Sequence, residues 1–189
     1  MTRIPALIAA LVVALAGCAP TAPITEDGTG GAGVYRISAQ DAAQIQFRML
    51  DSVNALRGAA GARALQLSAQ LNAAAAVHSR DMAAQNRPWH FGSDGSSPLQ
   101  RVQRAGYLGE LKGENISETF ETELETLAAW MEQPDTRRVI LARDARDLGV
   151  AWHQEANGKI WWTLITGGPA SKPSPQSSFA PLIGIEDAG

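Results

Sequence analysis

One cysteine and three histidines are the side chains of this 189-residue sequence best suited to nucleophilic, acid–base or metal chemistry. Because Cys18 has no second cysteine to pair with, the chain forms no internal disulfide, and a zinc cluster built on thiolates is excluded. His78 lies on an apolar stripe with Leu71 and Met82, and this pattern predicts a buried core histidine. His153 falls on a predicted strand and could face either side of a sheet. The serines stand in no context typical of a hydrolase nucleophile.

The amino terminus has the pattern of an export signal. Arg3 supplies a positive charge, and residues 4–17 carry no charged or strongly polar side chain. This apolar run is shorter than the roughly 20 residues that a membrane-spanning helix needs, and it predicts a signal peptide over residues 1–17. The run closes on Leu15-Ala16-Gly17-Cys18, which resembles the lipobox of bacterial lipoproteins.

The lipobox resemblance implies that Cys18 receives a lipid and that the signal is cut just before it. The membrane is then a partner of the mature chain, because two or more acyl chains make such an anchor durable. Ala19 stands where an aspartate often signals retention at the inner membrane. The resemblance therefore points to the cell envelope, and to the periplasmic face of the outer membrane if the source is Gram-negative. The alternative is an ordinary secretory signal with an incidental cysteine.

Composition divides the rest of the chain into three parts. Residues 18–36 are rich in Pro, Thr and Gly and predict a flexible tether, whereas residues 169–189 are a Pro- and Ser-rich tail. Residues 37–168 are numerous enough to bury one core without disulfides. The net charge is −3 and the basic residues are scattered, so nucleic acid is excluded as a partner, since its binding needs clustered cations.

The apolar periodicity of the central part is mostly helical at first. Helices are predicted after four capping residues, Ser38, Ser68, Ser97 and Thr122. A further helical turn is predicted near residues 136–141. The pattern then alternates over residues 148–154 and 160–166, and Asn157-Gly158 between them predicts a β-hairpin. Helices followed by a hairpin indicate an α+β domain.

Three tryptophans, Trp152, Trp161 and Trp162, cluster in the predicted hairpin. At least one of them is expected to fill the core, because an indole buries a large apolar area. One that stays exposed could stack on a sugar or on an acyl chain.

The order and spacing of several short segments resemble the CAP superfamily, also called the SCP domain. The segments are Asn54–Arg57, Leu65–Leu71, Ala75–Met82, His90–Gly95, Arg101–Tyr107, Gly113–Ile116, Trp130–Pro134, Arg137–Leu141 and Gly149–Ala151. The resemblance implies a three-layer α-β-α sandwich with a small central antiparallel sheet, which agrees with the helices and the hairpin. It points to the bacterial branch of the superfamily, in which burial alone holds the domain together.

The same resemblance implies a candidate site. In CAP domains two histidines and two acidic residues of a central cleft can bind a divalent metal, and His90 and Glu114 match two of these positions. Thr136 stands at the place of the second histidine, and Gln133 at that of the second glutamate. Two donors are fewer than the three that a catalytic zinc site needs, so tight zinc binding is not expected. A weakly bound divalent metal completed by water stays an alternative. The other interpretation is that His90 and Glu114 bond to each other or to the backbone.

Three functional hypotheses follow. The first is a non-enzymatic binding module, with His90, Glu114 and Thr136 beside an apolar ligand or a component of the cell envelope. The second is a divalent-metal-dependent, protease-like hydrolase that uses His90 and Glu114. The third is a purely structural or partner-binding lipoprotein. The incomplete metal set favours the first hypothesis over an enzyme, although fold membership cannot decide function.

Overall fold

A computed structural model describes residues 34–119 and 121–170 of the chain. The predicted signal peptide, the lipidation site Cys18, most of the predicted tether and most of the predicted tail therefore lie outside the described residues. Within the described part, no helix is both long and apolar enough to span a membrane.

The centre of the domain is a four-stranded sheet with the strand order β1-β3-β4-β2. The strands are β1 (Gln66–Leu67), β2 (Glu110–Thr119), β3 (Asp147–Gln154) and β4 (Ile160–Gly168). The predicted hairpin is confirmed: β3 and β4 pair antiparallel, and Gly158 takes the positive φ of 99° that its turn requires. β2 pairs antiparallel with β4, whereas the short β1 pairs parallel with β3, so that the small sheet is mixed.

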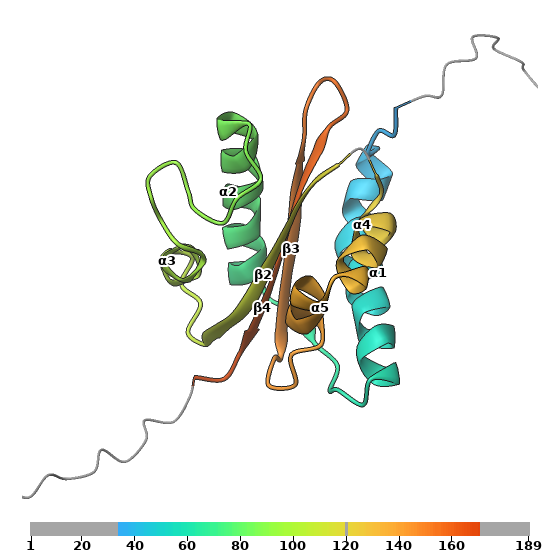
Figure 1. The fold of residues 1–189 in the computed structure, drawn as a ribbon, viewed down its shortest axis with the longest axis vertical. Helices are drawn as coiled ribbons and strands as arrows, with labels where there is room; N and C mark the ends of the chain where they lie inside the picture. The colour runs from blue at the N-terminus through green and yellow to red at the C-terminus, as the bar shows by residue number, and fades with distance from the viewer. Residues whose placement is uncertain (1–33, 120, 171–189) are drawn as a thin grey trace, which may run out of the picture. The chain divides into compact units, whose positions relative to one another are not determined.

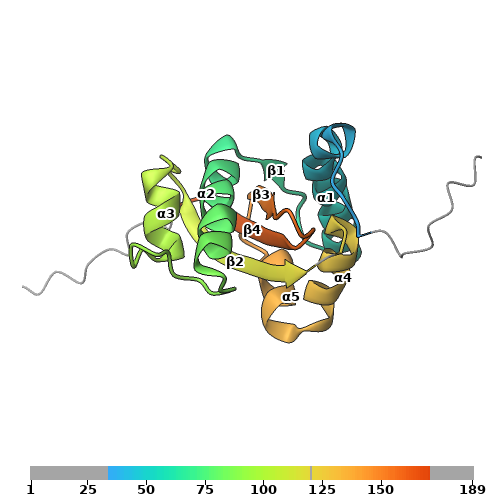
Figure 2. The ribbon, with the colours of Figure 1, turned by 90° about the horizontal axis from the view of Figure 1, so that it is seen from above.

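Helices cover both faces of this sheet, and the predicted α-β-α sandwich is confirmed (Figure 1). One face carries α2 (Ala69–Gln85) and α3 (Pro98–Arg104). The other carries α1 (Ala39–Ala59), α4 (Glu123–Glu132) and α5 (Pro134–Ile140), as Figure 2 shows from above. The four predicted capping residues begin α1 to α4, each accepting a hydrogen bond from a backbone N–H of the first turn.

Successive residues of β4 point to opposite faces and enter two separate apolar cores. Trp162 and Leu164 pack in the larger core with residues of α1, α4 and α5. Ile165 packs in the smaller core with Leu71 of α2 and Val102 of α3. Trp161 and Trp162 are both fully buried, as expected for at least one tryptophan of the hairpin.

Contacts with the domain begin slightly before the predicted start at residue 37. The side chain of Arg36 donates to the backbone oxygens of Glu155 and Ala156 in the hairpin turn. The backbone oxygen of Tyr35 accepts a hydrogen bond from Gln154. Tyr35 and Arg36 therefore belong to the domain and not to the tether, because the hairpin satisfies their polar groups.

Candidate functional site

Glu114 of β2 is the centre of a buried charged cluster. Its side chain is only 2% exposed, and it is held on the sheet by pairing with Ile165 of β4. Nη2 of Arg101, on α3, lies 2.9 Å and 2.7 Å from the two carboxylate oxygens. Nδ1 of His90 lies 2.9 Å from Oε1, and it must be the donor because a carboxylate can only accept. The structure thus brings His90 and Glu114 together.

Arg101 also fixes the loop that carries His90. Its Nη1 donates to the backbone oxygen of His90 at 2.9 Å and to that of Ser96 at 3.0 Å. The Arg101 side chain is 4% exposed, so its charge is compensated by Glu114 and not by water. The Arg101 guanidinium therefore links α3 to the loop of residues 90–96 and to β2.

His78 of α2 lies against the same carboxylate and is fully buried, as predicted. Its Nε2 donates to the backbone oxygen of Trp89 at 3.0 Å and lies 3.8 Å from Oε1 of Glu114. Burial lowers the pKa of His78 below its usual value, and the nearby Glu114 opposes this effect only in part. His78 is therefore a neutral neighbour of the cluster.

Thr136 is not part of this hydrogen-bonded cluster, which differs from the expectation that it lies beside His90 and Glu114. Asn115, which follows Glu114 on β2, donates to the backbone oxygen of Thr136 at 2.9 Å. Because neighbouring residues of a strand point to opposite faces, Thr136 lies across the sheet from Glu114. Its hydroxyl donates to the backbone oxygen of Trp130 at 2.6 Å, which joins the end of α4 to α5.

Two other positions considered from the sequence lie away from the Glu114 carboxylate. Gln133 is the residue between α4 and α5, on the Thr136 side of the sheet. His153 is half-buried on β3, where it pairs with Trp161 of β4 in the strand ladder. The hydrogen bonds of the carboxylate come instead from α3 and from the loop that carries His90.

The residues around Glu114 do not fit a divalent metal. Arg101 binds both carboxylate oxygens and already supplies the positive charge that a metal would bring. His90 spends Nδ1 on the same carboxylate. Among the described residues, no group of three or more His, Cys, Asp or Glu side chains is arranged to hold a metal ion. The charge of Glu114 is therefore balanced by the protein itself.

A cavity of about 500 Å³ opens between α2 and α3, beside the cluster. Its apolar side is formed by Ala73, Ala74 and Val77 of α2 and by Ala105. Arg101 lines it and connects it with Glu114. The polar rim consists of Asp81, Ser93, Asp94, Ser96 and Arg104. We call this space the α2–α3 cavity.

The charges on the rim of the α2–α3 cavity are already matched. Arg104 Nη1 lies 2.5 Å from Asp94 Oδ2. Hydrogen bonds from Ser96, together with Arg104, hold the pKa of Asp94 well below its usual value. The Asp81 carboxylate accepts from the backbone N–H of Ser93 at 2.7 Å and from its hydroxyl at 2.6 Å. The cavity thus presents apolar surface within a rim whose charges have partners.

Arg101 is a site residue that was not predicted from the sequence. It belongs to a segment that carries the CAP resemblance, but its type and position alone indicated no role. The sequence did indicate that Glu114 needs a partner if it is buried, because a buried carboxylate needs a cation or several hydrogen-bond donors to offset its lost hydration. The sequence does not say which of the arginines supplies that charge.

The sequence of this domain is similar to those of known proteins. A model of the cysteine-rich secretory protein family (CAP) matches residues 50–165. YkwD of Bacillus subtilis (strain 168), an uncharacterized protein, is 29% identical over 120 residues, which are 64% of this chain and 46% of YkwD. The chain therefore spans about half the length of that relative.

Two solved structures show the same fold. An outer surface protein from Borrelia burgdorferi has a TM-score of 0.59 at 14% identity, with 68% of this chain and 96% of that chain covered. An extracellular protein containing an SCP domain from Bacillus anthracis str. Ames has a TM-score of 0.58 at 22% identity, with 69% and 44% covered. At these identities the likeness shows the fold alone.

Proposed function

Because the chain belongs to the cysteine-rich secretory protein (CAP) family, we propose that it is a lipid-anchored, extracytoplasmic binding module whose ligand is apolar and enters the α2–α3 cavity. The observation that carries this proposal is the state of Glu114. Its two oxygens are bound by Arg101 and one of them also by His90, inside a buried cluster. A carboxylate fixed in this way is a structural anion, and it supports the wall of the cavity.

The chemistry of the α2–α3 cavity favours an uncharged, apolar ligand. Its apolar side is made of alanine and valine side chains, and Val77 is a large apolar residue that is 54% exposed. The rim charges have partners within the protein, so a charged ligand would have to displace them. An apolar group would gain about 25 cal/mol for each Å² of surface removed from water.

The placement outside the cytoplasm rests on the amino-terminal pattern and on the relatives. One relative of the same fold is described as an outer surface protein and another as an extracellular protein. The lipobox-like Leu15–Cys18 segment supplies the proposed anchor. A lipid on Cys18 would hold the binding domain at the membrane surface.

The binding proposal is tested by the compounds that purify with the protein. The full chain is extracted with organic solvent and the extract is analysed by mass spectrometry. Val77→Asp places a charge on the apolar side of the cavity, and we expect it to reduce the bound apolar compound at least about tenfold. Ala84→Asp, at an exposed position of α2 outside the cavity, is the matched control. Equal yields from the wild type and Val77→Asp would contradict the proposal.

A cellular role that survives Val77→Asp would favour the structural or partner-binding hypothesis.

The anchor is tested separately. Cys18→Ala is expected to move the protein from the membrane fraction to the soluble fraction and to abolish labelling with radioactive palmitate. Ala19→Ser keeps the thiol and is the control. Unlabelled wild-type protein would show that the segment is an ordinary secretory signal, and the binding proposal would be unaffected.

One observation favours hydrolysis as a second function. His90 gives its Nδ1–H to a carboxylate, which leaves Nε2 as the basic nitrogen of a side chain that is 49% exposed. General bases in enzymes are oriented in this manner. If His90 acts as a base, His90→Ala should lose peptidase and esterase activity on a panel of model substrates while it stays folded, because the His90 side chain is 49% exposed and the Arg101–Glu114 pair is left intact. Activity that is unchanged in this variant would remove the hypothesis.

A further inference from the structure

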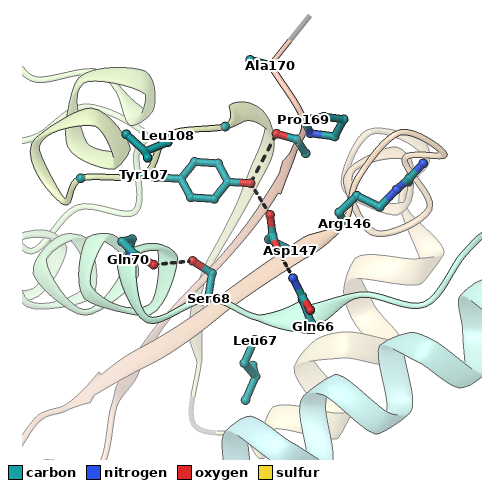
Figure 3. Close-up of a pocket in the computed structure, with 13 residues that line it drawn as sticks. Gln66, Leu67, Ser68, Gln70, Tyr107, Leu108, Arg146, Asp147, Pro169 and Ala170 are labelled. Atoms are coloured by element: carbon teal, nitrogen blue, oxygen red, sulfur yellow. Dashed lines mark hydrogen bonds between the residues drawn. The ribbon is translucent and has the colours of Figure 1, made fainter.

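A second cavity, of about 600 Å³, lies at the end of the sheet where β4 finishes. Four segments that are far apart in the sequence form it: β1 with the start of α2, the loop after α3, the start of β3, and the end of β4 (Figure 3). Its lining residues are all different from those of the α2–α3 cavity. We call it the Tyr107 cavity.

Polar groups fill the walls of the Tyr107 cavity and bond to one another. The hydroxyl of Tyr107 donates to Asp147 Oδ2 at 2.6 Å, and Nε2 of Gln66 donates to the other oxygen of Asp147 at 3.0 Å. Ser68 donates to Oε1 of Gln70 at 3.2 Å. Figure 3 shows these interactions facing the same space. The exposed amides of Gln66 and Gln70 have further hydrogen-bonding capacity for a ligand, whereas the Ser68 oxygen also accepts the capping bond from the Leu71 N–H.

The fold holds the Tyr107 and Asp147 part of this arrangement in place. Gly167 of β4 lies so close to Tyr107 that a Cβ there would be 2.3 Å from the Tyr107 hydroxyl oxygen. The backbone N–H of Arg146 donates to the oxygen of Gly167 at 2.7 Å, and that of Gln66 donates to the oxygen of Arg146 at 3.0 Å. Burial and the hydrogen bond to Asp147 raise the pKa of Tyr107, so that its hydroxyl stays protonated. Preorganised polar groups lose little entropy on binding.

We propose that the Tyr107 cavity binds a glycan, that is, a short oligosaccharide of the cell envelope. Vicinal hydroxyl groups both donate and accept, which matches a wall that combines a carboxylate, two amides and two hydroxyls. Arg146 and Asp147 carry opposite charges, which suits a ligand without a large net charge. Leu108, 95% exposed on the rim, supplies an apolar surface for the C–H face of a sugar ring. The volume lies within the range of small-molecule sites, about 300 to 1,000 Å³.

The test is calorimetric titration of the full chain, purified in detergent, with two probes. N,N′,N″,N‴-tetraacetylchitotetraose represents the amide-bearing glycans of cell walls, and maltotetraose represents neutral glucans. We expect at least one of them to bind with a dissociation constant below about 1 mM. Gln70→Ala and Tyr107→Phe should each weaken this binding about tenfold, because each removes hydrogen-bonding capacity from the wall. The probe that binds identifies the source of the glycan.

Two controls separate this site from the rest of the molecule. Gln103→Ala changes an exposed glutamine of α3 outside the cavity and should leave the affinity within about twofold of the wild type. Val77→Asp, in the α2–α3 cavity, should also leave glycan binding intact. Gln70 is exposed and its loss should not affect folding, which near-UV circular dichroism would verify. The proposal is overturned if neither probe binds up to about 10 mM, or if Gln70→Ala and Tyr107→Phe bind as well as the wild type.

Discussion

The face of the sheet under α1, α4 and α5, which we call the apolar face, and the face under α2 and α3, which we call the charged face, satisfy their buried charges differently. On the apolar face, the buried Arg57 donates to backbone oxygens and the buried Glu123 pairs with the partly exposed Arg48. On the charged face, Arg101 and Glu114 are both buried and pair with each other.

On the apolar face Trp162 and Leu164 meet a continuous apolar core. On the charged face a smaller apolar core shares the interior with His78, Arg101 and Glu114. The large core of the apolar face gains stability from each apolar group in proportion to its area, whereas the buried ion pair of the charged face is stable only when both partners are present.

The largest effect expected from this comparison is the loss of an aromatic group on the apolar face. Trp162→Ala should lower the free energy of unfolding by about 4 kcal/mol, because it leaves a large cavity among fully buried neighbours. Urea denaturation followed by circular dichroism measures the change. Phe47→Ala on α1 is the control, since Phe47 is 57% exposed and should cost less than about 1 kcal/mol. Similar losses for the two variants would contradict the described packing.

On the charged face, breaking a pair should cost more than replacing it. Arg101→Met is expected to lower the free energy of unfolding by about 3 kcal/mol, because it leaves Glu114 buried with His90 as its remaining partner. The double variant Arg101→Met/Glu114→Leu should recover at least half of that loss. Arg104→Met is the matched control, since Arg104 is 61% exposed and its pair with Asp94 is solvated. Additive losses in the double variant would show that the two side chains are not coupled.

The sequence predicted the fold well where the determinants are local. Ser68 and Thr122 are capping residues that act within one helical turn, and the Asn157-Gly158 turn requires only its own backbone geometry. β2 was not predicted as a strand, because Lys112, Gly113 and neighbouring polar residues are poor strand formers. Its conformation depends on pairing with β4, which is distant in the sequence and buried along its whole length.

The candidate site was only partly accessible from the sequence. The CAP resemblance singled out His90 and Glu114, which the structure brings within 2.9 Å of each other. It also suggested Thr136, but alignment with a motif does not reveal which face of a sheet a residue occupies. Asn115 contacts Thr136, and the adjacent Glu114 contacts Arg101. A shift of one residue along β2 therefore moves a side chain from one face of the sheet to the other.

The charged face should also make stability depend on pH through His78. The pKa of His78 is lowered in the folded protein, so the unfolded chain binds the proton more readily. Stability is therefore full above the unfolded pKa of about 6.5 and falls as the pH drops below it, by at most about 1.4 kcal/mol per pH unit. Urea denaturation at pH 7 and pH 5 measures this slope.

A matched pair of variants assigns that slope to one group. His78→Gln cannot gain a proton and should flatten the dependence between pH 7 and pH 5. Ser79→Ala removes a neighbouring buried hydroxyl that bonds to Thr163 and the Ala151 backbone, and it should lower stability without changing the slope. If His78→Gln keeps the slope of the wild type, another group is responsible and His78 is not the pH-sensitive element of this face.

The smallest effect expected is at Thr136, and it decides whether the two faces are functionally separate. Thr136→Val removes the hydroxyl that bonds to the Trp130 backbone, and it should cost about 1 kcal/mol of stability. Because Thr136 lies across the sheet from Glu114, the variant should retain the compound bound in the α2–α3 cavity at the wild-type level. The same mass-spectrometric measurement provides the comparison. A loss of bound compound at unchanged stability would contradict this separation. It would mean that a change under α5 alters the α2–α3 cavity through the sheet.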